Sequence, residues 1–260
     1  APLHNTAGRL FQQSLQGILE TTSPRAWSFA ILGLHEYLQR FAGDRRAYQI
    51  LEDLAGRLLD LYRRNCAAEW RWFESTLTYC NATLAHASLL AGETLVNSEM
   101  AAVGLDALGW LMALQQADTP GRHFVPIGSN GFYPRGEERA RFDQQPVEAQ
   151  ATVSACLEAY RLTHDKDWHD QARNVFEWFL GRNDLHVSVY DPTTGGCRDG
   201  LHADRPNENQ GAESTLAFLQ ALLEQRLAES TIPAGEYRFD EQPTLAALPA
   251  PQSQPHFERR

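Results

Sequence analysis

The stretch from Asn207 to Glu224 reads N-E-N-Q-G-A-E-S-T-L-A-F-L-Q-A-L-L-E, and it decides the fold of this chain. A polar loop ends at Gly211, and small and apolar residues with helical spacing follow it. Glu213 lies in the first turn of this predicted helix. Because so few charges follow Glu213, the helix is predicted to be an inner, buried element.

Two earlier stretches follow the same plan. The segment W-R-W-F-E-S-T-L-T-Y-C-N-A-T-L-A-H-A-S-L-L-A from Trp70 to Ala91 places Glu74 at its predicted helix start. The segment F-D-Q-Q-P-V-E-A-Q-A-T-V-S-A-C-L-E-A-Y from Phe142 to Tyr160 places Glu148 at the start of its predicted helix. Three helices each begin with an acid after a polar or aromatic loop. This recurrence predicts that the three helix starts lie together on one rim of the fold.

Buried and amphipathic helices alternate along the chain. The buried type is predicted at 24–41, about 74–91, 146–162 and 211–226, and the amphipathic type at 45–64, 97–116 and 167–180, with one further helix at 6–20. Long loops at 117–145 and 181–210 connect an amphipathic helix to the next buried one. This order predicts an all-α fold, an α/α toroid of helical hairpins with small-residue inner helices and amphipathic outer helices. The helices are too few for a complete six-hairpin barrel. A plain bundle or an open solenoid also accommodates hairpins, but a solenoid predicts loops of regular length.

Composition limits the class of protein. The chain has 260 residues and a net charge of -10, which argues against a nucleic-acid binder. It shows no apolar run of membrane-spanning length and no signal segment, so we expect a cytoplasmic protein of bacterial type. The four cysteines show no metal-binding spacing, so we expect free thiols, no metal and no cofactor. Residues 1–228 are predicted to form the toroid domain, and the proline-rich tail 229–260 to be extended or poorly ordered.

The predicted rim combines carboxylates with aromatic and amide side chains. Glycoside hydrolysis needs two carboxyl groups across the scissile bond, and aromatic faces stack on sugar rings. The candidate catalytic residues are Glu74, Asp143, Glu148, Asp199 and Glu213. The candidate substrate-binding residues are Trp72, Tyr79, Asn81, Asn130, Phe132, Tyr133, Arg135, Gln145, Asn209 and Gln210.

Each of these signals also has a structural interpretation. An acid in the first turn of a helix is favoured by the helix dipole and by capping. Trp72 is more typical of a core wedge than of a sugar platform. The recurrence of the acid in three buried helices favours a function, because an interior carboxylate is costly unless it is used or paired. Three loop histidines, His123, His186 and His202, keep a proton-transferring epimerase or isomerase as another alternative.

Four stretches carry a resemblance to a known family: W-F-E-S-T-L-T-Y-C-N-A, P-I-G-S-N-G-F-Y-P-R-G, F-D-Q-Q-P-V-E-A and Y-D-P-T-T-G-G-C-R-D-G-L with N-E-N-Q-G-A-E-S-T-L. They resemble an uncharacterised bacterial α/α-toroid family within the six-hairpin glycosidase-like group, found beside glycosyltransferase domains or fused behind them. The resemblance covers about residues 24–227. It implies a toroid fold and a carbohydrate context, and it assigns no catalytic residue.

The sequence therefore predicts a carbohydrate-active protein, glycoside hydrolase-like, with an oligosaccharide or sugar as its substrate. The cleft is expected at the N-terminal ends of the inner helices. The first alternative is a non-catalytic glycan-binding or accessory domain of a glycosyltransferase, which would then be a partner. The second is the sugar epimerase or isomerase that uses the loop histidines. No nucleic-acid or membrane partner is predicted.

Overall fold

The computed structural model describes residues 2–118 and 121–231. Helices dominate this part of the chain, which confirms the all-α prediction. The last helix continues to Thr231, three residues into the predicted tail. The rest of that tail, from residue 232 on, lies outside the described residues. No described helix is both long enough and apolar enough to cross a membrane.

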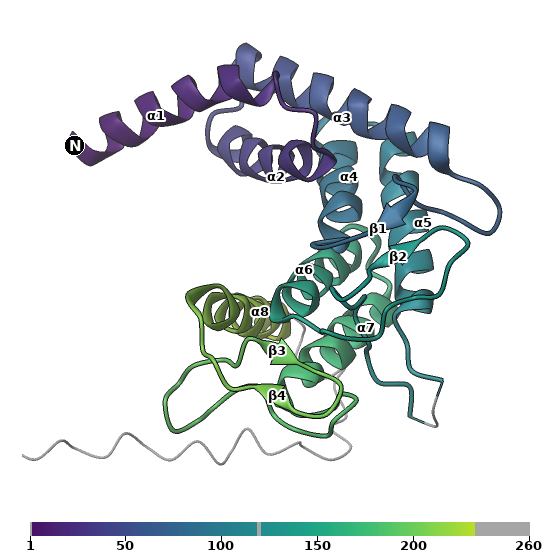
Figure 1. Cartoon of the computed structure of the whole chain (residues 1–260). Helices are drawn as coiled ribbons and strands as arrows, with labels where there is room; N and C mark the ends of the chain where they lie inside the picture. The colour runs from purple at the N-terminus through teal and green to yellow at the C-terminus, as the bar shows by residue number, and fades with distance from the viewer. Residues whose placement is uncertain (1, 119–120, 232–260) are drawn as a thin grey trace, which may run out of the picture.

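The helices form an inner and an outer layer (Figure 1). The inner helices are α2 (Pro24–Arg40), α4 (Ala82–Thr94), α6 (Pro146–Thr163) and α8 (Ala212–Thr231). The outer helices are α1 (Pro2–Ile18), α3 (Arg45–Asn65), α5 (Ser98–Leu114) and α7 (Lys166–Phe176), the last continued by the 3-10 turn η1 (Glu177–Leu180). The inner helices are neighbours in chain order, since α2 packs on α4, α4 on α6 and α6 on α8. Figure 1 shows them as an arc with α1 and α2 at one end and α8 at the other.

Small residues let the inner and outer layers approach closely. The backbones of α4 and α5 meet at Gly92 and Gly104. A Cβ atom at Gly92 would lie 2.6 Å from the amide nitrogen of Ala101, and one at Gly104 would lie 2.9 Å from the side chain of Leu89. Side chains larger than glycine would therefore push the hairpin apart. The core, with Trp178, Leu54 and Leu111 among its buried residues, extends along the arc as one cluster.

The loops that precede three inner helices are joined to one another. Strand β1 (Thr76–Leu77), before α4, pairs antiparallel with β2 (Tyr133–Pro134), before α6. Strand β3 (Gly200–Leu201) pairs with β4 (Pro206–Asn207) before α8. Gln144 exchanges backbone hydrogen bonds with Leu201, which connects the loop before α6 to the loop before α8. These pairings hold the starts of α4, α6 and α8 in a fixed mutual arrangement.

One helix boundary differs from the sequence prediction. Glu74 was expected in the first turn of an inner helix, but α4 begins eight residues later at Ala82, so that prediction is wrong. Thr76 and Leu77 form β1 instead, paired with β2, and the β-branched residues Thr76 and Thr78 favour an extended backbone there. Glu148 and Glu213 do lie in the first turns of α6 and α8, as predicted.

Candidate functional site at the starts of the inner helices

Arg25 connects the starts of two inner helices. It is the second residue of α2, and its buried side chain reaches toward the loop before α4. Its Nη1 donates to Oε2 of Glu74 at 2.7 Å, its Nε to the carbonyl of Tyr79 at 2.5 Å, and its Nη2 to Oδ1 of Asn81 at 3.3 Å. The guanidinium also lies over the Tyr79 ring, 5.0 Å from its centroid. Glu74 thus belongs to the rim although it is not helical.

Glu148 ties the start of α6 to the start of α4. Its side chain accepts from the backbone N–H of Cys80 at 2.5 Å, from the N–H of Asn81 at 3.4 Å, and from the Asn81 side-chain amide at 3.3 Å. The residue is 2% exposed. Burial raises the pKa of Glu148 to about 7, against the lowering effect of these donors and of Arg25. This carboxyl group therefore titrates near neutral pH, but its oxygens are occupied by the protein.

Glu213 lies close to the same group of side chains. The pKa of the Cys80 thiol is raised to about 12, mainly by burial and also by the negative charges of Glu148 and Glu213, while Arg25 lowers it. Glu213 is therefore within electrostatic reach of the start of α4. Its own side chain is exposed, and no hydrogen bond or ion pair to another described residue holds it. Glu74, Glu148 and Glu213 thus gather around Arg25 and Cys80.

The other two candidate carboxylates bond within the loops. Oδ1 of Asp143 forms an ion pair with Nδ1 of His202 at 2.7 Å, and both side chains are partly exposed. Asp199 caps α8, because it accepts from the N–H of Gly211 at 2.8 Å and from the side chains of Asn209 and Ser214. Burial would raise the pKa of Asp199, but these donors outweigh it and lower the pKa. Asp199 therefore has a structural task at the helix start.

The candidate sugar-binding residues divide by exposure. Trp72 is fully buried and stacks on Trp110, so its ring belongs to the core and offers no face to a ligand. Asn81 is also buried and holds Glu148. Tyr79 is 50% exposed, beneath the Arg25 guanidinium. The remaining candidates are exposed or partly exposed in the loops: Asn130, Phe132, Tyr133, Arg135, Gln145, Asn209 and Gln210.

Several of these loop residues already have protein partners. Arg135 pairs with Glu69 at 3.3 Å and lies over the ring of Trp70, which also contacts Tyr133. The Gln210 amide donates to Asp191 at 3.0 Å. Of the predicted set, Tyr79 is the aromatic side chain that the structure places directly at the cluster around Arg25.

Sequence reasoning did not single out Arg25. A signal was present, because Arg25 is the one charged residue between Pro24 and Leu34 in a helix that is otherwise apolar over this range. A lone cation at the start of an inner helix is the counterpart of the acids at the starts of α6 and α8. The helix dipole disfavours a cation at a helix N-terminus, so a specific partner had to be expected.

A cavity of about 730 Å³ lies along the concave face of the four inner helices. Its lining includes Phe29, one turn after Arg25, and Gln150, two residues after Glu148, so it begins close to the rim. Deeper in the cavity, Ser154 donates to Oε2 of Glu224 at 2.5 Å. Burial raises the pKa of Glu224 and lowers the pKa of His86 to about 4. The cavity is thus partly polar, with acids and a neutral histidine.

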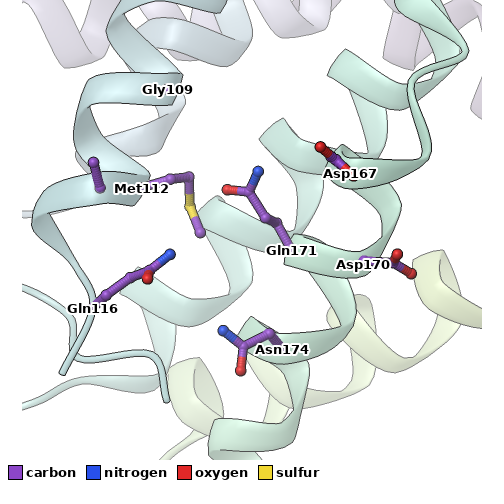
Figure 2. Close-up of a pocket in the computed structure, with 8 residues that line it drawn as sticks. Gly109, Met112, Gln116, Asp167, Asp170, Gln171 and Asn174 are labelled. Carbon is purple, nitrogen blue, oxygen red and sulfur yellow. The ribbon is translucent and has the colours of Figure 1, made fainter. Parts of the chain in front are cut away.

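A second groove, of about 470 Å³, lies on the outer layer between α5 and α7. Figure 2 shows Met112 and Gln116 on one side and Asp167, Asp170, Gln171 and Asn174 on the other. None of the predicted rim residues lines it. The groove is therefore separate from the cluster around Arg25, and its residues serve as controls for experiments on the rim.

The loop histidines do not form one group. Nε2 of His123 bonds to Asp184 at 2.7 Å, and the rings of His123 and His186 are 6.3 Å apart. His202 pairs with Asp143 instead. Among the described residues, no cluster of three or more histidine, cysteine or acidic side chains has the arrangement of a metal site. The cysteines are free thiols.

Comparison with known proteins supports the fold. No protein-family model matches the chain, and no curated protein is similar to it in sequence. Among solved structures, it is similar to the GH76A alpha-1,6-mannanase from Salegentibacter sp. HEL1_6, with a TM-score of 0.54 and 12% sequence identity. The match covers 81% of this chain and 56% of that one. The fold is thus an α/α toroid, and this chain spans a little over half of the similar structure's length.

Proposed function

We propose that this chain binds a saccharide across the starts of its inner helices and acts on a glycosidic bond as a glycoside hydrolase-like protein. The observation that carries the proposal is the convergence of Glu74, Glu148 and Glu213 on Arg25 and Cys80. The similar mannanase supports a saccharide as the ligand. The exposed ring of Tyr79 supplies an aromatic face for the C–H side of a sugar.

We assign different tasks to the three acids in this proposal. Glu148 positions the helix starts, because its oxygens accept from Cys80 and Asn81 and almost none of it is exposed. Glu74, the carboxylate partner of Arg25, suits the base or nucleophile. Glu213 is exposed and free of partners among the described residues, so a substrate can reach its carboxyl group, and we assign it the acid–base role at the leaving oxygen.

The test is an assay for new reducing ends on an oligosaccharide panel that includes alpha-1,6-linked mannose oligomers. We expect turnover by the wild-type chain and a loss of roughly 100-fold or more in Glu213→Gln, the usual contribution of a positioned proton donor. Asp170→Asn removes one negative charge in the outer groove, which none of the predicted rim residues lines, and is expected to keep full activity. A wild-type chain that is silent across the panel contradicts hydrolysis.

One observation favours a second candidate, a non-catalytic glycan-binding or accessory domain of a glycosyltransferase. Four of the five candidate carboxylates are engaged by protein donors, and Glu213 is the exception among them. A site with only one free acid can bind the hydroxyl groups of a glycan, but it lacks the second free carboxyl group that hydrolysis needs. Calorimetric binding of a glycan in the absence of turnover would select this candidate.

A further inference from the structure

The cavity of about 730 Å³ on the concave face is lined by residues of α2, α4, α6 and α8. Its volume lies within the range of about 300 to 1,000 Å³ that is typical of small-molecule sites. None of the three acids that gather at the rim, Glu74, Glu148 and Glu213, lines it. The polar groups in its walls therefore form a set of their own.

Glu224 brings a carboxylate without a counter-ion into this cavity. Its Oε2 accepts from the Ser154 hydroxyl at 2.5 Å, while its Oε1 accepts from no described residue. Burial raises the pKa of Glu224 and the Ser154 hydroxyl lowers it, and no cation among the described residues contributes. An interior carboxylate that lacks a counter-ion is costly, so a bound cation is favoured beside it.

Gln150 fixes the direction of the hydrogen bond to Glu224. Its side-chain amide donates to the Ser154 hydroxyl at 2.9 Å, so that the proton of this hydroxyl is left for Glu224. The chain Gln150–Ser154–Glu224 thus occupies one carboxylate oxygen and holds the side chain in place. The other oxygen, Oε1, is the one that a ligand can use.

His86, on α4, adds an uncharged acceptor to the lining. It forms no hydrogen bond with another described residue. Burial lowers its pKa to about 4, so at neutral pH one ring nitrogen carries no proton and the ring does not repel a cation. His35 also lines the cavity, but its Nδ1 is bonded to the Thr94 hydroxyl at 2.8 Å.

The charged groups of the cavity favour a cation over an anion. Arg161 is the one arginine or lysine among the described residues that line it. Its guanidinium is already engaged by two acids, with Nη2 2.6 Å from Oε1 of Glu158 and Nη1 2.9 Å from Oε1 of Glu93. Glu224 and the exposed Glu36 remain without a cation, so the lining is negative as a whole.

Apolar side chains make up another part of the lining. Phe29 on α2 and Leu223 on α8 are 52% and 58% exposed, and Leu32 and Leu90 also line the cavity. An apolar ligand body that covers such side chains removes their surface from water, which favours binding.

From the unpaired carboxylate, the uncharged imidazole and the apolar walls, we propose that this cavity binds an organic cation, an ammonium group carried on an apolar body. The ammonium group donates to Oε1 of Glu224, and the apolar body lies against Phe29 and Leu223. His86 accepts from a further N–H or O–H group where the ligand has one. The site is separate from the rim and does not depend on the saccharide function.

NMR titration of two matched probes into the full chain tests the proposal. At about pH 7.5, 2-phenylethylamine carries an ammonium group, and 2-phenylethanol has a hydroxyl group in its place. We expect saturable binding of the amine with a dissociation constant of about 1 mM or below, the range of a good ligand with so few atoms. The alcohol should bind more weakly by roughly tenfold or more, because it makes no charge-assisted hydrogen bond.

Glu224→Gln isolates the charge. Its side chain keeps the shape of glutamate and can still accept from Ser154, but we expect it to weaken amine binding by roughly tenfold or more. It should also abolish the preference for the amine over the alcohol. Glu229→Gln changes an exposed acid of α8 outside the lining, and Glu213→Gln changes the free acid of the rim. Both controls should bind the amine like the wild type.

Phe29→Ala isolates the apolar contact. We expect it to weaken the amine and the alcohol alike, because both probes carry the same apolar body. Phe41→Ala is the matched control, since Phe41 is 55% exposed and does not line the cavity. Its affinity for both probes should equal that of the wild type.

Any one of four results overturns the proposal. The first is a wild-type chain without saturable binding of 2-phenylethylamine, and the second is equal affinity for the amine and the alcohol. The third is a Glu224→Gln chain that keeps its helical circular dichroism and binds the amine like the wild type. The fourth is wild-type affinity for both probes in Phe29→Ala.

Discussion

At the scale of single residues, the rim depends on buried charged groups that bond to one another. Arg25 donates to Glu74, to Asn81 and to the carbonyl of Tyr79, and Glu148 accepts from the loop next to them. Removing one partner from such a set lowers the free energy of unfolding by more than the intact set adds to it, because the remaining group is left buried and unpaired. These residues therefore fix the positions of the helix starts as well as the charge of the rim.

The pKa of Glu148 predicts a measurable dependence of stability on pH. Burial raises this pKa from 4.5 to about 7, so between these values the folded chain holds a proton that the unfolded chain has lost. The free energy of unfolding should accordingly fall as pH rises from about 4.5 to about 7, by at most about 3 kcal/mol from this group. Urea unfolding at pH 5, 6, 7 and 8 measures it.

Glu148→Gln separates this contribution from other titrating groups. The variant has no proton to release at this position, so its stability should change less with pH over the same window. Glu137→Gln, at an exposed position, should keep the wild-type dependence. Equal pH dependence in the wild-type and Glu148→Gln chains would show that Glu148 titrates normally.

At the scale of elements, backbone pairings join the described loops that precede the inner helices. Gly200 shows how the loop before α8 meets the loop before α6. Its φ is +138°, and a Cβ atom there would lie 2.0 Å from the carbonyl oxygen of Gln144. That oxygen accepts the N–H of Leu201 at 2.9 Å. A glycine is needed for both the conformation and the close approach.

Gly200→Ala should therefore separate the two loops. We expect a loss of about 3 kcal/mol or more in the free energy of unfolding, since both a clash and a broken backbone bridge result. Gly195→Ala is the matched control, because Gly195 also has a positive φ, +76°, but nothing lies within 4 Å of its Cβ position. Its cost should be the conformational strain of about 1 kcal/mol. Equal costs in urea unfolding would contradict the bridge.

The helices could be predicted from the sequence and the loop structure could not. The alternation of buried and amphipathic segments follows from side-chain periodicity, and it placed Glu148 and Glu213 correctly in the first turns of α6 and α8. The segment around Glu74 was misassigned because Thr76 and Leu77 obtain their strand structure from Tyr133 and Pro134, more than fifty residues away. Periodicity carries no information on such a distant partner.

Part of the candidate site was beyond prediction for the same reason. The burial of Trp72 depends on its stacking with Trp110, and the role of Arg25 depends on Glu74, 49 residues along the chain. Asp199 was predicted from its loop position, but its contacts with Gly211 and Asn209 identify it as a cap. Residue type alone does not distinguish a carboxylate that binds a ligand from one that holds the protein together.

At the scale of the whole molecule, the described helices form an open arc that has its predicted chemistry at one rim (Figure 1). The loops before α4, α6 and α8 join on the rim side, and the concave face below contains the cavity with Glu224 and His86.

Calorimetric titration of a saccharide into three chains tests the central claim, that the starts of the inner helices form one saccharide-binding mouth. The chains are the wild type, Tyr79→Ala at the rim and Asp170→Asn in the outer groove. Loss of a stacking ring at a binding site weakens affinity by roughly tenfold. We predict this loss in Tyr79→Ala and unchanged binding in Asp170→Asn; wild-type affinity in Tyr79→Ala, or a loss in Asp170→Asn alone, would contradict the claim.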